Sequence, residues 1–242
     1  MVSRNRAAVQ EPEVLEVILK GIEPGPSTPE YRALRLLTNR GTVSCRYYPV
    51  TKPMSAVIWV GGVGGDWDTP AQGLYPRLCE SLRHKAITSL RVQFRQPGIL
   101  EESVLDVLVG ASYLKGEGVI RLGLVGHSFG GAVVIQAAAA CQAVRTVVTL
   151  ATQSYGAEAV EELGPRCSVL LLHGTADRIL PARCTEAVYR MARDPKALRL
   201  FEDAEHGLDE VADRVETLIS DWLVNQLQRP ARSAPHPADS AM

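Results

Sequence analysis

The sequence predicts an α/β protein with a mostly parallel central β-sheet flanked by helices on both faces. Short apolar segments alternate with segments of about 10–15 residues that have helical periodicity, an order typical of βαβ units. Most of the strand-like segments are apolar throughout, as expected for strands that are covered on both faces. Parallel strands share their carboxyl ends, and such a sheet binds its ligand at that edge.

The predicted strands and helices follow one another along nearly the whole chain. Strands are expected at Val14–Leu19, Gly41–Tyr48, Ala56–Val60, Ile87–Phe94, Arg121–Val125, Arg145–Leu150, Ser168–His173 and Leu198–Phe201. The first two strands are expected to form an opening pair, the second of them antiparallel. Helices are expected at Leu74–His84, Glu101–Lys115, from the glycine-rich turn at Gly130 to Cys141, at Cys184–Ala192 and at Asp209–Gln228.

The chain of 242 residues is predicted to form one domain over residues 13–228. Residues 1–12 lack periodicity and are expected to be loose. Residues 229–242 form a Pro/Ala/Ser-rich string that cannot bury a core, and a disordered tail is expected there.

Composition excludes several classes of function. The net charge is −1 and no dense Lys/Arg run occurs, so a nucleic-acid partner is not expected. No apolar stretch reaches the roughly 18 residues that a spanning helix needs, and the N-terminus lacks a signal-peptide core. A cytoplasmic location is therefore expected. The five scattered cysteines indicate neither a disulfide framework nor a zinc site. Nothing calls for a metal or organic cofactor, and the sequence does not indicate an oligomeric state.

Ser128 lies in the string Gly126-His127-Ser128-Phe129-Gly130, which matches the pattern G-x-S-x-G. The string follows an apolar strand and opens a helix, the context in which this pattern forms a strained turn that exposes a nucleophilic serine. Glycines are expected on either side because a Cβ there would clash with the turn. An incidental serine in a glycine-rich turn is the alternative. His127 is expected only to pack or to form a hydrogen bond.

A serine hydroxyl needs a base to remove its proton, and the base needs an acid to orient it. Asp177 follows the predicted strand Ser168–His173, and His206 follows the predicted strand Leu198–Phe201. Both are therefore expected at the same sheet edge as Ser128, in the chain order serine, acid, histidine. An acid that only forms a turn and an exposed loop histidine are the alternatives. His173 is expected to satisfy local backbone groups.

With these motifs the chain resembles the α/β-hydrolase superfamily over about Val14 to Leu227. Besides the serine turn, the stretch from His173 to Pro181 matches the pattern H-G-x-x-D-x-x-x-P, and Glu205-His206-Gly207 is similar to the catalytic-histidine loop. Phe94-Arg95-Gln96-Pro97-Gly98 resembles an arginine-containing loop of the family. The chain is most similar to compact, lidless members of the dienelactone-hydrolase or small-carboxylesterase kind. Only about 17 residues separate the strands that a lid would separate.

The resemblance implies an oxyanion hole formed by the backbone N–H groups of Phe129 and Val63. Many family members have His-Gly where this chain has Gly61-Gly62, so the exact shape of the hole is left open. Substrate-pocket residues are expected among Trp67, Arg95 and Tyr155. For Arg95 the alternative is a structural salt bridge.

The predicted function is hydrolysis of a small or medium carboxylic ester or thioester through an acyl-serine intermediate. Its partner is thus a small-molecule acyl substrate. The same triad serves acyl transfer and amide or peptide cleavage, so these activities stay open. A non-catalytic binding module with this fold is the alternative from a different class.

Overall fold

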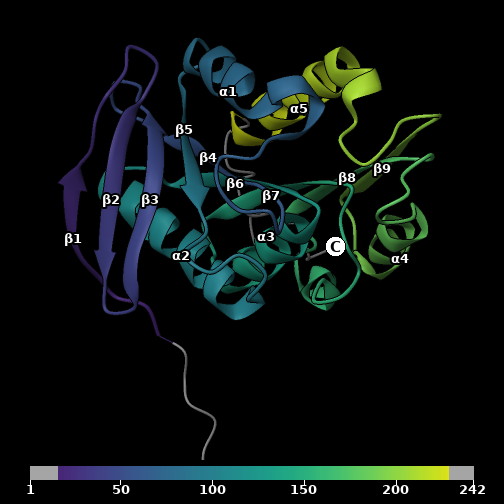
Figure 1. Ribbon diagram of the computed structural model, residues 1–242, viewed down its shortest axis with the longest axis horizontal. Coiled ribbons are helices and arrows are strands. Elements are labelled where there is room, and N and C mark those ends of the chain that lie inside the picture. Colours follow the sequence, from purple (N-terminus) through teal and green to yellow (C-terminus); the bar gives the residue numbers. More distant parts are fainter. Residues whose placement is uncertain (1–15, 229–242) are drawn as a thin grey trace, which may run out of the picture.

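A single nine-stranded sheet organises the computed structural model, which describes residues 16–228 (Figure 1). The strand order across the sheet is β1-β2-β3-β5-β4-β6-β7-β8-β9. The strands are β1 (Leu19–Pro24), β2 (Arg32–Thr38), β3 (Gly41–Tyr48), β4 (Ser55–Val60), β5 (Ile87–Gln93), β6 (Arg121–His127), β7 (Val144–Leu150), β8 (Ser168–Gly174) and β9 (Lys196–Phe201). The segments 1–12 and 229–242, predicted to be loose, lie outside the described residues.

The first three strands form an antiparallel edge. β1 pairs with β2, β2 with β3, and β3 with β5, each antiparallel. The predicted opening pair was therefore incomplete, because β2 was not predicted. Of the strand predicted at Val14–Leu19, the first two residues lie outside the described part of the chain, and β1 begins at Leu19 with residues that are exposed or half-buried.

The remaining six strands are parallel and carry the apolar sequence that predicted them. β4 and β8 are buried at every position, as expected for strands that are covered on both faces. β4 pairs with β5 and β6, and the ladder continues through β7 and β8 to β9. Because these strands run in one direction, the loops that follow β4 to β9 meet at one edge.

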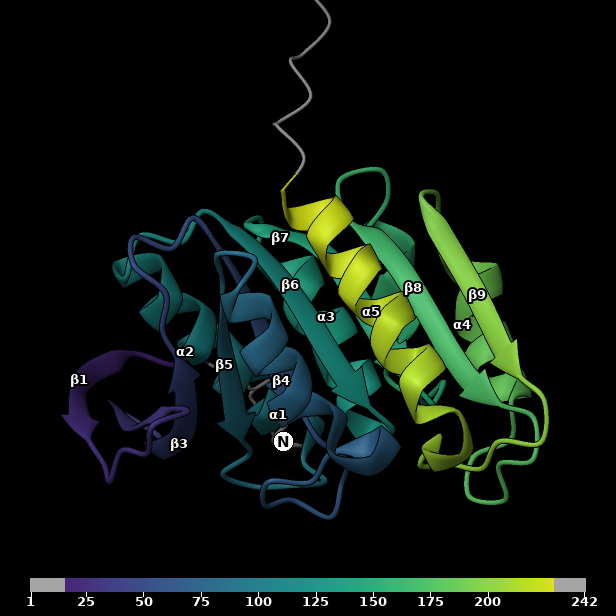
Figure 2. The ribbon, with the colours of Figure 1, turned by 90° about the horizontal axis from the view of Figure 1, so that it is seen from above.

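Helices cover both faces of the sheet, as Figure 2 shows. The helices are α1 (Pro70–Arg83), α2 (Leu100–Gly116), α3 (Phe129–Ala140), α4 (Arg183–Met191) and α5 (Ala212–Leu227). α1 and α5 lie on one face, and α2, α3 and α4 lie on the other. Each face buries its own apolar cluster, one around Leu124 and Val133 and the other around Trp59 and Ile219. The predicted α/β architecture is confirmed.

The starts of the first and last helices can be compared with the sequence prediction. Ala71, Gln72 and Gly73 have positive φ, so the regular part of α1 begins at Leu74, as predicted. The last helix was predicted from Asp209, but Asp209–Val211 forms a 3-10 turn, η2, and α5 begins at Ala212.

The connection between β7 and β8 contains one short 3-10 helix, η1 (Glu158–Glu162). No lid is inserted there, in agreement with the length of this connection in the sequence. Within residues 16–228, no helix has the length and apolar character needed to cross a lipid bilayer.

Candidate active site

Ser128 occupies a strained turn between β6 and α3. Its backbone has φ 55° and ψ −118°, outside the regions that a side-chain-bearing residue ordinarily adopts. Gly126 and Gly130 leave room for this turn, because a Cβ on Gly126 would clash with the Gly130 carbonyl and a Cβ on Gly130 would clash with that of Gly61. The Ser128 N–H donates to the Leu150 carbonyl of β7 at 2.8 Å. The sequence-based steric reason for the two glycines is confirmed.

Asp177 and His206 form a direct hydrogen-bonded pair. His206 Nδ1 lies 2.7 Å from Asp177 Oδ2, and the Asp177 side chain is fully buried. The other carboxylate oxygen accepts the N–H groups of Ile179 and Leu180 at 2.8 and 2.9 Å. Burial alone would raise the pKa of Asp177, but the bonds from His206, Leu180 and Ile179 outweigh it and hold this pKa below its usual value. The carboxylate is therefore ionised at neutral pH and orients the ring.

His173 supports the same carboxylate from the end of β8. Its Nε2 lies 2.8 Å from the Leu180 carbonyl and 3.0 Å from Asp177 Oδ2, and its Nδ1 lies 2.6 Å from the Thr185 hydroxyl. The predicted bond to local backbone is confirmed, but the contact with Asp177 was not predicted. The four-residue spacing of histidine and aspartate in the H-G-x-x-D pattern is the signal that could have indicated it.

His127 holds the main chain of the His206 loop. Its Nε2 lies 3.0 Å from the His206 carbonyl oxygen, so Nε2 carries the proton and donates. The two rings lie 4.7 Å apart at 49°. His127 Nδ1 is buried and, within the described residues, has no hydrogen-bond partner. Burial, the largest effect, lowers the pKa of His127 and keeps its ring neutral. The predicted packing and hydrogen-bonding role of His127 is confirmed.

The structure brings Ser128, Asp177 and His206 to one edge of the sheet. His127, the residue before Ser128, contacts both the ring and the carbonyl of His206. Within residues 16–228 the Ser128 hydroxyl makes no hydrogen bond to the His206 ring. Such bonds are often long or unformed in ligand-free hydrolases and tighten when substrate binds.

Two backbone N–H groups near Ser128 are free to meet an anion. Phe129 is the first residue of α3, and Val63 lies in the turn after β4. Neither N–H donates to another group in the part of the chain that the structure describes. Gly130 packs against the Gly61 carbonyl and so ties this turn to the start of α3.

The three predicted pocket residues lie in different surroundings. Tyr155 is 79% exposed in the loop after β7. The ring of Trp67 lies against the Arg46 guanidinium, 4.1 Å from the ring centroid, and its carbonyl accepts a bond from Arg91 at 2.6 Å. Trp67 therefore packs towards β3 and β5.

Arg95, expected among the pocket residues with a structural salt bridge as the alternative, forms buried ion pairs in the structure. Its side chain is only 6% exposed and forms an ion pair with Asp106 through Nε and with Glu102 at 2.9 Å through Nη2. Nη1 donates to the Arg40 carbonyl at 2.6 Å. The guanidinium is thus bound within the protein and cannot meet a substrate carboxylate.

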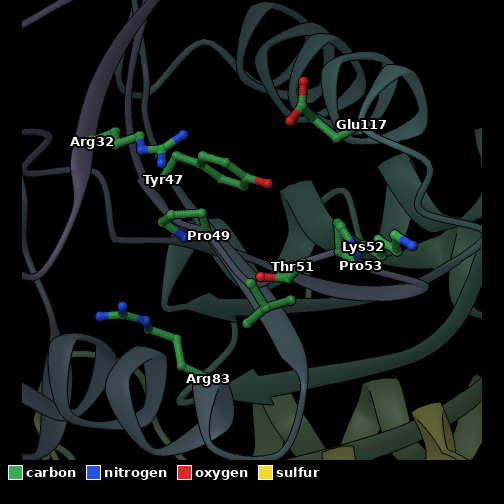
Figure 3. A pocket seen from close by; sticks show the side chains of 9 residues that line it. Arg32, Tyr47, Pro49, Thr51, Lys52, Pro53, Arg83 and Glu117 are labelled. Atoms are coloured by element: carbon green, nitrogen blue, oxygen red, sulfur yellow. The ribbon is translucent and has the colours of Figure 1, made fainter.

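A pocket of about 560 Å³ lies elsewhere (Figure 3). Arg32, Tyr47, Lys52 and Glu117 line it, together with residues that precede β4. It therefore opens at the sheet edge where β4 begins, opposite the edge that carries Ser128. The candidate active site does not coincide with this pocket.

Solved structures share this fold over nearly their whole length. A dienelactone hydrolase from Anabaena variabilis superposes with a TM-score of 0.71 at 16% identity, covering 85% of this chain and 99% of its own. Est1E from Butyrivibrio proteoclasticus gives 0.68 at 16% identity, covering 80% and 98%. XC6422 from Xanthomonas campestris, described as a serine hydrolase without a lid, gives 0.65 at 18% identity, covering 85% and 100%. The fold is that of the α/β hydrolases.

The family model of the dienelactone hydrolases matches residues 73–220. The match spans more than half of the chain, which therefore belongs to the dienelactone hydrolase family. Curated relatives match over a shorter segment. The uncharacterised protein YfhR of Salmonella typhi is 38% identical over 60 residues, which is 25% of this chain and 20% of that protein. The chain thus matches about a fifth of the length of these relatives. Family membership supports a hydrolase activity of the α/β type.

The ion pairs of Arg95 generate a prediction about stability. Asp106 is fully buried, and burial raises its pKa despite the bonds from Arg95. Arg95→Met would leave this carboxyl group without its cation, and the free energy of unfolding is expected to fall by about 3–5 kcal/mol in urea titrations. Arg35→Met, which breaks an exposed pair with Glu23, is the matched control and is expected to cost at most about 1 kcal/mol. Equal losses in the two variants would contradict the assignment.

His127 generates a prediction about pH. Its pKa is lowered in the folded protein from the ordinary value of 6.5, so the unfolded chain binds more protons and stability falls as the pH drops below about 6.5. The facing groups are the His206 carbonyl, whose hydrogen bond raises this pKa, the His206 ring, whose charge lowers it, and Asp68 and Asp177, which raise it. His127→Gln keeps a donor for the His206 carbonyl but does not titrate.

The measurement is the free energy of unfolding at pH 7.5 and at pH 5.5. Wild type is expected to lose more stability on acidification than His127→Gln. The control His84→Gln changes a histidine whose side chain is 77% exposed and should keep the wild-type slope. A His127→Gln slope as steep as that of wild type would show that this ring is not the titrating group.

Proposed function

We propose that the chain is a serine hydrolase that cleaves a small or medium carboxylic ester or thioester. In this proposal Ser128 is the nucleophile, His206 the general base and Asp177 the acid that orients it. The observation that carries the proposal is the 2.7 Å bond between His206 Nδ1 and Asp177 Oδ2 beside the strained turn of Ser128. Membership of the dienelactone hydrolase family supports it.

The first half of the reaction forms an acyl-serine. With Nδ1 bonded to Asp177, His206 Nε2 carries a lone pair and takes the proton as Ser128 Oγ attacks the acyl carbon. The carbonyl π electrons move to oxygen, which becomes an oxyanion. Collapse of this intermediate expels the alcohol or thiol, which receives the proton from Nε2. Asp177 stays ionised throughout and stabilises the imidazolium that forms.

Hydrolysis of the acyl-serine repeats these steps with water. His206 Nε2 takes a proton from water, whose oxygen attacks the acyl carbon, and then returns the proton to Ser128 Oγ as the carboxylic acid leaves. The short connection between β7 and β8 and the exposure of Tyr155 favour water as the acceptor, because the site lies open to solvent.

Phe129 and Val63 are the proposed oxyanion donors. Their backbone N–H groups have no partner within the described residues, and that of Phe129 lies at the positive end of the α3 dipole. Each such donor stabilises the transition state by about 3 kcal/mol. Gly61-Gly62 serves this arrangement without the histidine of other members, since the donors belong to the backbone.

Replacement of the proposed nucleophile tests the proposal. Ser128→Ala is expected to lower kcat on p-nitrophenyl acetate by about 10³-fold or more, because no acyl-enzyme can form. A fluorophosphonate probe is expected to label the folded wild type at Ser128 and to leave the variant unlabelled. Ser220→Ala, a serine on α5, is the matched control and should keep wild-type turnover and labelling.

Unchanged turnover in Ser128→Ala would overturn the proposal. A folded wild type that neither turns over esters nor reacts with the probe would instead favour the non-catalytic binding module. Turnover only when an alcohol or amine acceptor is added would identify an acyltransferase.

A further inference from the structure

Large apolar side chains are exposed in four loops at the edge that carries Ser128. Val63 follows β4 and is 59% exposed, Ile99 follows β5 and is 46% exposed, and Tyr155 follows β7 and is 79% exposed. Ile179, 70% exposed, follows β8. Apolar side chains that gather on a protein surface mark a binding site more often than single exposed ones do.

Contacts between the loops bring three of these residues near one another. Val63 Cγ2 lies 3.3 Å from the place where a Cβ on Gly98 would sit. Leu100, the first residue of α2, lies so close to Gly156 that a Cβ there would clash with it. We call three exposed residues in or beside these contacts the apolar rim: Val63, Ile99, which lies between Gly98 and Leu100, and Tyr155, which precedes Gly156.

The apolar side chains beneath this surface continue to the residue beside Ser128. The ring of Phe129 contacts the ring of Phe94 edge to face, with centroids 5.8 Å apart. Phe94 begins the loop that carries Ile99. The loop of His206 lies on the other side of the sheet edge, since the Gly207 carbonyl accepts the N–H of Ala71 in α1 at 2.7 Å. The apolar rim therefore lies on the α2 and α3 side of Ser128, and His206 lies on the α1 and α5 side.

This arrangement assigns the two halves of the substrate. The group that returns a proton to the leaving oxygen must lie beside that oxygen, so the alcohol lies on the His206 side. The acyl chain then extends to the opposite side. We infer that the apolar rim binds the acyl chain and that the preferred acyl group is apolar and uncharged. This inference rests on the proposed function.

The charges at this edge disfavour an anionic acyl group. Arg95, the cation nearest in sequence to Ile99, is bound by Glu102 and Asp106. Arg178, in the loop after β8, has Glu205 at 4.0 Å. A carboxylate at the end of an acyl chain would therefore lose its hydration on the apolar rim without gaining a cation there.

A series of p-nitrophenyl esters tests the inference, because only the acyl group changes. The probes are the acetate, the butyrate and the hemisuccinate, the last matching the butyrate in chain length but ending in a carboxylate. Each methylene buried on the rim is expected to raise kcat/KM about fourfold. Wild type is therefore expected to prefer butyrate over acetate by about fourfold or more, and butyrate over hemisuccinate by about tenfold or more.

Ile99→Ser and Tyr155→Ser are expected to lower the butyrate-to-acetate ratio of kcat/KM by about threefold or more each, with little change on acetate. The matched control is Ile120→Ser. Ile120 is 54% exposed just before β6, at the opposite edge, and its substitution should leave the ratio unchanged. All three side chains are exposed, so the variants are expected to fold, which circular dichroism checks.

A butyrate-to-acetate ratio that stays at the wild-type value in both rim variants would overturn the inference, as would a preference for the hemisuccinate. An equal fall in Ile120→Ser would also overturn it. Labelling of Ser128 by the fluorophosphonate separates these outcomes from failure of the proposed function. If Ser128 is labelled but the ratio is unchanged in the rim variants, only the role of the rim is rejected. If the wild type shows neither ester turnover nor labelling, both proposals are rejected.

Discussion

The close approach of three backbone segments at Ser128 is the constraint on which the site depends. β6, the start of α3 and the turn after β4 meet where Gly126 faces the Gly130 carbonyl and Gly130 faces that of Gly61. No side chain fits at either glycine without displacing main chain. The same contacts hold Ser128 at a positive φ and fix the turn that carries Val63 against the first turn of α3. The serine and the proposed oxyanion donors are thus positioned by one feature.

A second set of contacts fixes the imidazole. The Asp177 carboxylate meets His206, His173 and the N–H groups of Ile179 and Leu180. These contacts keep the carboxylate ionised and fix its orientation. His127, adjacent to Ser128 in the sequence, bonds the His206 carbonyl and packs against its ring. The position of the histidine loop therefore depends on the same turn that positions the serine.

Most of the fold was predictable from the sequence because its signals are local. An apolar run such as Ser168–His173 indicates a buried strand, and the glycine pattern around Ser128 indicates a tight turn. Neither signal requires knowledge of residues distant in the sequence. β2 was missed although its burial alternates, with Leu34 and Leu36 buried and Arg35 exposed.

The misassigned and missed residues depend on tertiary contacts. Arg95 precedes α2 by five residues, and only the path of the chain back along that helix brings Glu102 and Asp106 to its guanidinium. The apolar rim was not predicted as a surface, although Val63 and Tyr155 were each predicted as site residues. Its residues come together through contacts between loops that are far apart in the sequence. Sequence position predicts the edge of the sheet at which a residue lies, whereas its side-chain partners depend on the tertiary structure.

We propose that the turn of Ser128 and the turn of Val63 together bind a tetrahedral acyl intermediate. A crystal structure of the protein after reaction with diisopropyl fluorophosphate measures this directly. We expect phosphorus bonded to Ser128 Oγ, with its free oxygen about 2.7–3.1 Å from the N–H groups of Phe129 and Val63. Phosphorus on another residue, or a phosphoryl oxygen turned away from both N–H groups, would contradict it.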